Sequence, residues 1–157
     1  MISLYVLLKL VHVLSAAVLF GTGAGIAFFM VRARSTRDPA VAAAVGRMVV
    51  QADFLFTATA VVVQPLSGLA LMRLQGYSPG EPWLLASYGL YVLVGACWLP
   101  VVWIQQRLVR LAAAAAAAGE PLPPAYDRLY RIWFALGWPA FAGVIGIYVL
   151  MLSRPAF

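Results

Sequence analysis

Four long apolar stretches constrain the fold of this chain more than any other feature of its sequence. They cover approximately residues 2–31, 48–72, 83–105 and 132–152. Each reaches the roughly 20 residues that a helix needs to cross about 30 Å of hydrocarbon. Because a segment in lipid must satisfy its backbone hydrogen bonds internally, we expect helices. The sequence therefore predicts an all-α, polytopic membrane four-helix bundle, with residues 1–157 forming one transmembrane domain.

The composition supports a membrane environment. Hydrophobic residues make up 64% of the chain and charged residues only 10%, whereas a soluble domain carries about 25% charged residues. Cys97 is the only cysteine, so neither an intrachain disulfide nor a thiolate metal cage is expected.

The distribution of positive charge predicts an orientation. Basic residues outnumber acidic ones by 11 to 5, and most of them border the first and third connectors. By the positive-inside rule these connectors are cytoplasmic, which places both termini outside, N-out and C-out, in a bacterial inner membrane. Membrane topology accounts for the charge, so we expect the lipid bilayer and no nucleic acid as a partner. The basic residues at these connectors are Arg32, Arg34, Arg37, Arg47, Arg107, Arg110, Arg128 and Arg131.

An alanine tract at 112–118 follows the third apolar stretch. Alanine is the best helix former, so the third helix is expected to extend to residue 118, before Gly119 and the prolines that follow it.

Ionisable residues inside the predicted spans are candidate functional sites, because burying them in lipid is costly. Lys9 and His12 lie three residues apart and share a helix face. His12 is a candidate metal or haem ligand or proton carrier, or else an imidazole hydrogen-bonded between helices. Lys9 is expected to extend toward the outer headgroups. Other polar side chains are predicted at comparable depth: Gln64, Tyr88, Tyr91 and Tyr148.

Asp53 lies near the predicted cytoplasmic end of the second span, and Arg107 and Arg131 border the same side. These charges predict an ion pair that fixes the second helix to its neighbours. The alternative is a proton relay, and Thr57 could belong to either arrangement.

Small residues recur at four-residue spacing in the first span, at Ala17, Gly21 and Gly25. This pattern lets helices approach closely. It predicts a packing surface, either inside the bundle or between copies of the chain.

Several segments resemble an uncharacterised bacterial membrane family, domain of unknown function 2269. They are YVLLKLVHVLSAAVLFGTGAGIAFFM, QADFLFTATAVVVQPLSGLALM, LYVLVGACWLPVVWIQQRL and YRIWFALGWPAF. The layout is also similar to HemJ-type protoporphyrinogen oxidases and, more distantly, to CopD copper-resistance proteins. HemJ-type proteins open with Lys-x-x-His, which Lys9 and His12 match. That resemblance implies haem b binding by His12.

With a single histidine, three haem arrangements remain open. The iron could be five-coordinate, Met72 could supply a second ligand, or two copies of His12 could share a haem in a homo-oligomer. Lys9 could pair with a propionate, and Gln64 could orient the imidazole. The rival expectations are a membrane partner or assembly protein without a cofactor, and a small transporter coupled through Asp53 or Lys9.

Overall fold

The computed structural model describes residues 2–155, and within them every regular element is helical. The elements are α1 (Leu4–Ser35), α2 (Pro39–Ala52), the π-helical turn η1 (Asp53–Thr57), α3 (Ala58–Gln75), α4 (Pro82–Ala118) and α5 (Pro124–Ser153). Because α2, η1 and α3 run on without a break, these residues form four helices that are long and apolar enough to span a membrane. The predicted all-α, four-helix membrane architecture is confirmed.

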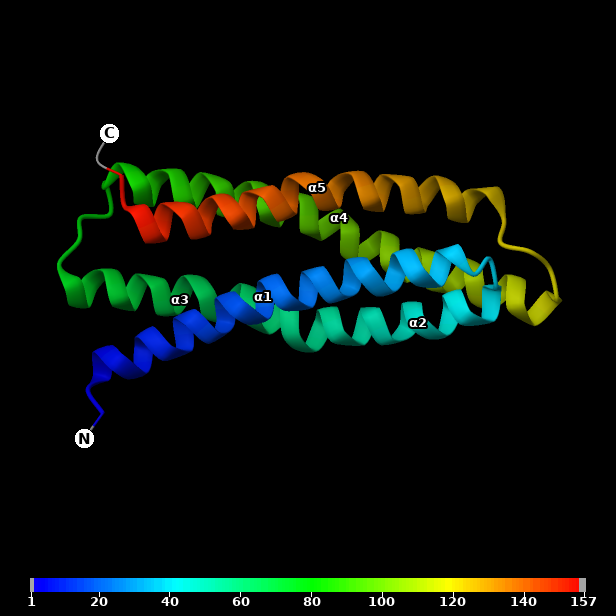
Figure 1. The fold of residues 1–157 in the computed structure, drawn as a ribbon, viewed down its shortest axis with the longest axis horizontal. Helices are drawn as coiled ribbons and strands as arrows, with labels where there is room; N and C mark the ends of the chain where they lie inside the picture. The colour runs from blue at the N-terminus through cyan, green and yellow to red at the C-terminus, as the bar shows by residue number, and fades with distance from the viewer. Residues whose placement is uncertain (1, 156–157) are drawn as a thin grey trace.

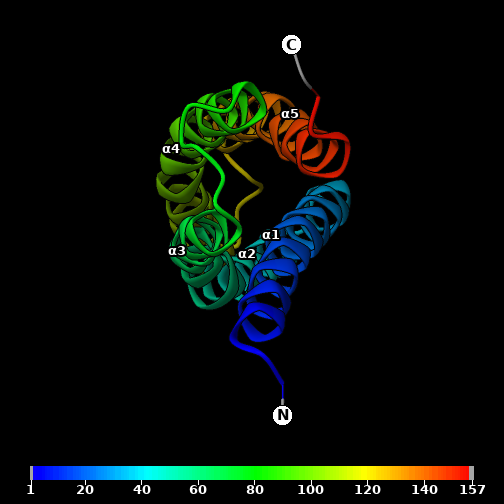
Figure 2. The same ribbon diagram turned by 90° about the vertical axis from the view of Figure 1, so that its left-hand side faces the viewer.

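The start of α1, the end of α5 and the α3–α4 hairpin lie at one end of the bundle, which we call the terminal end (Figure 1). The α1–α2 and α4–α5 connectors lie at the opposite end, which we call the connector end. Viewed from the terminal end, α3 and α4 lie on one side of the bundle and α1 and α5 on the other (Figure 2).

Local sequence signals explain the helix boundaries. Ser3 caps α1 by accepting a hydrogen bond from Val6 N at 3.3 Å, and Asp38 caps α2 by accepting from Ala40 N at 2.8 Å. Gly119 ends α4 with a φ of 66°, in the left-handed region where glycine carries no steric penalty.

The helices extend beyond the apolar stretches of the sequence. At about 1.5 Å per residue, the 37 residues of α4 span roughly 56 Å, well beyond a hydrocarbon core of about 30 Å. The start of α5 is one such difference, since α5 begins at Pro124 rather than near residue 132. Proline at the first helical position is compatible with a helix start. The first turns of α5 are polar, so an apolar stretch does not include them.

The bundle is tightly packed at the connector end. Tyr126, Leu108 and Met30 are each at most 2% exposed there. The core cluster combines residues of α1, α2, α4 and α5: Ile26, Met30, Ala42, Ala43, Val49, Ile104, Leu108, Ala112, Tyr126, Tyr130 and Trp133. This core holds the four helices together at the connector end, and the bundle is more open toward the terminal end.

Candidate functional site

A large cavity runs along the inside of the bundle from the terminal end toward the packed core. Its volume is about 1020 Å³, and α1, η1, α3, α4 and α5 all contribute to its wall. Ligand sites in proteins are mostly apolar clefts of about 300–1,000 Å³ with a few convergent polar groups. The wall here is mostly apolar as well, and its polar side chains form two groups.

The first group, which we call the His12 cluster, joins α1 to α3 near the terminal end. His12 Nδ1 lies 3.2 Å from the backbone oxygen of Gln64 and 3.0 Å from Ser67 Oγ. A carbonyl oxygen can only accept, so Nδ1 carries the proton and Nε2 holds the lone pair. The amide nitrogen of Gln64 lies 3.3 Å from Nε2 and donates to it.

Two serines complete the cluster. Ser67 Oγ donates to the backbone oxygen of Val63 at 2.7 Å, which leaves its lone pairs for His12. Ser15 Oγ hydrogen-bonds to Gln64 Oε1. Both ring nitrogens of His12 are therefore paired, and the cluster fastens α1 to α3. Gly68 permits this contact, because a Cβ there would stand 3.0 Å from His12 Cε1.

The second group, which we call the inner group, lies deeper in the cavity. It consists of Asp53, Thr57, Gln105 and Trp133, all lining the cavity wall. Asp53 Oδ1 accepts a hydrogen bond from Trp98 Nε1 at 3.2 Å. At about 1.5 Å per residue, Asp53, Gln105 and Trp133 each lie roughly 30–35 Å along their helices from the terminal end, so three helices bring them to a similar depth.

The predicted ion pair of Asp53 with Arg107 or Arg131 is wrong. Among residues 2–155 the one ion pair joins Arg34 to Asp127, at 2.7 Å. Arg107 instead packs its guanidinium 5.3 Å from the centre of the Trp103 ring, and Arg131 is exposed. Asp53 faces the interior while these arginines lie on the outside of the bundle, so burial and helix rotation separate them.

The other sequence-predicted residues divide between the cavity and its surroundings. Lys9, Gln64, Tyr91 and Tyr148 line the cavity together with His12. Lys9 is exposed, with its ammonium 5.6 Å from the centre of the Tyr5 ring.

Met72 does not line the cavity. It packs with Trp83 and Leu84, and its sulfur accepts a hydrogen bond from the Tyr88 hydroxyl at 3.4 Å. The structure therefore does not bring Met72 to His12. Met151 of α5 lines the cavity instead.

Gln105 was missed in the sequence, although a signal was present. Tyr91, Trp98 and Gln105 recur at seven-residue intervals in α4, which places them on one helix face. All three line the cavity.

The glycine stripe of α1 is not a contact between helices of one chain. A Cβ at Gly21 or Gly25 would meet nothing within 4 Å, whereas one at Gly46 or Gly143 would come within 3.0 Å of a valine methyl. The close helix approaches are thus on α2 and α5, because the stripe of α1 turns away from its neighbours.

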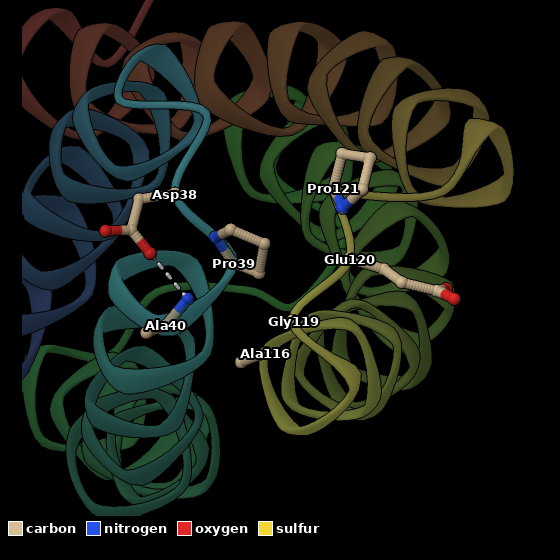
Figure 3. A pocket seen from close by; sticks show the side chains of 7 residues that line it. All are labelled: Asp38, Pro39, Ala40, Ala116, Gly119, Glu120 and Pro121. Atoms are coloured by element: carbon tan, nitrogen blue, oxygen red, sulfur yellow. Dashed lines mark hydrogen bonds between the residues drawn. The ribbon is translucent and has the colours of Figure 1, made fainter.

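A shallower hollow of about 360 Å³ at the connector end is a poor candidate for chemistry. It lies between the start of α2 and the end of α4. Figure 3 shows the Asp38 carboxylate turned back to its own helix, where it caps Ala40, while the Glu120 side chain points away. The two carboxylates do not converge. Among the described residues no group of three His, Cys, Asp or Glu side chains is placed to hold a metal.

Comparison with known proteins places the chain in a family. None of the curated proteins and none of the solved structures matches it. A family model described as a predicted integral membrane protein, DUF2269, matches residues 6–155, nearly the whole chain. The chain therefore belongs to the DUF2269 family of integral membrane proteins.

Proposed function

We propose that this protein binds a small, largely apolar molecule within the membrane, in the cavity between its helices. The observation that carries the proposal is the cavity itself, about 1020 Å³ in volume and lined by two separate polar groups in an otherwise apolar wall. An apolar body would occupy the space between the helices, and polar groups on the ligand would meet the two ends. The setting we propose is a bacterial inner membrane.

Access to the cavity is supported by the arrangement of α1 and α5. They touch through Phe20, whose ring centre lies 4.8 Å from that of Phe141 and 6.0 Å from that of Tyr148. Toward the N-terminus α1 diverges from α5 (Figure 1). A molecule dissolved in the bilayer would enter there without crossing the packed connector end.

A cavity-filling variant tests the proposal. Gly95 lines the cavity, and a Cβ there would meet nothing within 4 Å, so Gly95→Leu fills space without a backbone clash. Gly89 of the same helix is exposed and equally free of neighbours, so Gly89→Leu is the matched control. The probe is naphthylmethanol, titrated into protein in lipid nanodiscs while quenching of tryptophan fluorescence is measured.

Saturable binding that Gly95→Leu weakens about tenfold, a loss of about 1.4 kcal/mol, and Gly89→Leu leaves unchanged would support the proposal. Equal quenching in all three proteins, rising linearly with probe, would mean simple partition into lipid and would overturn it. Mass spectrometry of molecules that co-purify with wild type but not with Gly95→Leu would identify the natural ligand.

Haem b is a second candidate ligand, supported by the state of His12. Its Nδ1–H is held by the backbone oxygen of Gln64, the kind of outer partner that orients ligating imidazoles. Its Nε2 lone pair meets only the Gln64 amide, at 3.3 Å, so ligation requires that amide to turn aside. Lys9 and Arg154 line the cavity near the terminal end, where they could pair with propionates.

The chemistry that bound haem would supply is one-electron redox chemistry. The test is the visible spectrum of protein expressed with haem available. A Soret band that is lost in folded His12→Ala would support haem binding through His12. A folded native protein without a Soret band would rule it out and leave the cavity for another apolar ligand.

A further inference from the structure

Four polar atoms of the inner group have no hydrogen-bond partner in the described part of the chain. They are Asp53 Oδ2, Thr57 Oγ1, Gln105 Oε1 and Trp133 Nε1. Their residues are only 4%, 7%, 2% and 5% exposed. Leaving a buried polar atom unpaired costs about 1–3 kcal/mol. All four residues line the same cavity, so their unpaired atoms indicate a site that is completed by something else.

The backbone conformation also indicates a functional site at the inner group. Asp53 and Thr57 are the first and last residues of η1, where the Ala58 N–H bonds to the Asp53 carbonyl in place of the usual α-helical partner. Single π-helical turns inside α-helices occur frequently at functional sites. Here the turn lies within a helix that otherwise continues from Pro39 to Gln75.

The charge of the inner group is unbalanced. Among the described residues Asp53 is the one acidic residue that lines the cavity; its Oδ1 accepts a hydrogen bond from Trp98, and its Oδ2 has no partner. The cationic groups of the cavity are directed elsewhere: Lys9 lies over Tyr5, and the Arg154 guanidinium lies 5.4 Å from the centre of the Tyr77 ring. An ionised carboxylate that is buried without a cation is costly, so a ligand that carries a positive charge would stabilise Asp53 in its ionised form.

The remaining groups favour an organic cation. Three of the four unpaired atoms are oxygens that accept hydrogen bonds, and an ammonium offers up to three N–H donors. Trp98 and Trp133 also line the cavity, and indole rings attract cations through their faces. A hard metal ion such as Ca²⁺ prefers about six to eight oxygen ligands, which one carboxylate between indoles does not supply.

We propose that the inner group binds the protonated amine of a lipophilic ligand, with Asp53 as its counter-ion. The inference rests on the proposed binding of a small molecule in the cavity, and it defines the chemical class of that molecule. Thr57 and Gln105 accept hydrogen bonds from the ammonium. Trp133 Nε1 donates to an acceptor atom beside it.

The test compares naphthylmethylamine, which is protonated at neutral pH, with naphthylmethanol, which has a similar shape and no charge. Both are titrated into protein in nanodiscs of neutral lipid, with empty nanodiscs as the blank. Wild type is expected to bind the amine about tenfold more tightly than the alcohol. Asp53→Asn keeps the shape of the side chain and the acceptor for Trp98, and it should abolish the preference.

Asp127→Asn is the matched control. It removes a carboxylate that pairs with Arg34 outside the cavity, and it should leave the preference intact. If Asp53→Asn does not fold, Gln105→Met serves instead. It removes one unpaired acceptor at similar volume, so it should weaken amine binding several-fold more than alcohol binding.

The outcomes separate the two proposals. Equal affinity of wild type for amine and alcohol would overturn the amine site while leaving cavity binding in place. A tenfold preference that survives in Asp53→Asn would also overturn it. Binding of neither probe would overturn both proposals.

Discussion

Pro65 and Tyr91 show how one residue can depend on another in a lipid environment. Pro65 has no N–H, so the carbonyl of Val61, four residues earlier, loses its helical partner. The Tyr91 hydroxyl of α4 donates to this carbonyl. The interruption in α3 is thus converted into a hydrogen bond between α3 and α4, beside the cavity.

We predict that Tyr91→Phe lowers the free energy of unfolding by about 1–2 kcal/mol, because it leaves the Val61 carbonyl unpaired. Adding Pro65→Ala restores a backbone donor and should recover most of that loss. The measurement is thermal unfolding in detergent of the two single variants and the double variant. Tyr88→Phe, whose hydroxyl bonds only a thioether, is the control. Strictly additive effects of Tyr91→Phe and Pro65→Ala would contradict the coupling.

At the scale of elements, α4 and α5 form the most extensive contact between two helices, and a glycine lies where they meet. A Cβ on Gly143 would stand 2.7 Å from Val94 Cγ2. Valine has a stiff χ1, so it cannot easily turn aside. The contact faces the interior of the bundle, where Val94 also lines the cavity.

Gly143→Ala is expected to destabilise the protein by about 1–3 kcal/mol, because the added methyl forces the two helices apart. Gly89→Ala in α4 meets no neighbour, and its better helix propensity should stabilise the protein or leave its stability unchanged. Thermal unfolding of the two variants in the same detergent distinguishes packing from propensity. Equal stability of both would show that α5 tolerates a wider separation.

The whole molecule is divided between a packed connector end and a hollow terminal half. At the connector end Arg34 lies 2.7 Å from Asp127 and 4.6 Å from the centre of the Tyr130 ring. The two side chains of the ion pair are 39% and 51% exposed, so water screens the pair and it contributes at most about 1 kcal/mol. The stability of this end must come mainly from its core cluster, which leaves the terminal half free to hold a cavity.

The basic residues that surround the connector end predict the orientation in the membrane. We expect a reporter fused to the C-terminus to be active outside the cytoplasmic membrane, and one inserted after Gly119 to be active in the cytoplasm. Two reporters are fused in parallel at each site: alkaline phosphatase, which is active outside the cytoplasm, and a fluorescent protein, which fluoresces in the cytoplasm. A cytoplasmic C-terminus would reverse the orientation.

The glycine stripe of α1 is a candidate contact between copies of the chain. Gly21→Leu should leave the unfolding temperature of the isolated chain unchanged, because a Cβ there meets nothing within 4 Å. If copies of the chain associate through this stripe, the same change should shift the protein to a smaller oligomer. Oligomer size is measured by light scattering in detergent, and Val13→Leu on the same helix is the control. Loss of stability with no change in oligomer size would contradict both expectations.

The sequence by itself determined the four membrane helices, since hydropathy and segment length depend only on local composition. It also identified His12 and Asp53 as costly residues inside spans, and it predicted the depth that His12 shares with Gln64. Caps and stops such as Asp38 and Gly119 are local as well, so they could be read before the helices were placed.

Only the tertiary structure decided which faces of the helices meet. Rotation about a helix axis is set by packing against neighbours, and a sequence apolar on all sides does not reveal it. For this reason the ion pair expected at Asp53 was wrong, and the glycine stripe of α1 faces away from the neighbouring helices. For the same reason Gln105 was not predicted to line the cavity. The π-helical turn at Asp53–Thr57 was not predicted from the sequence either. This turn carries Asp53 Oδ2 and Thr57 Oγ1, the two atoms without partners that α4 and α5 do not supply.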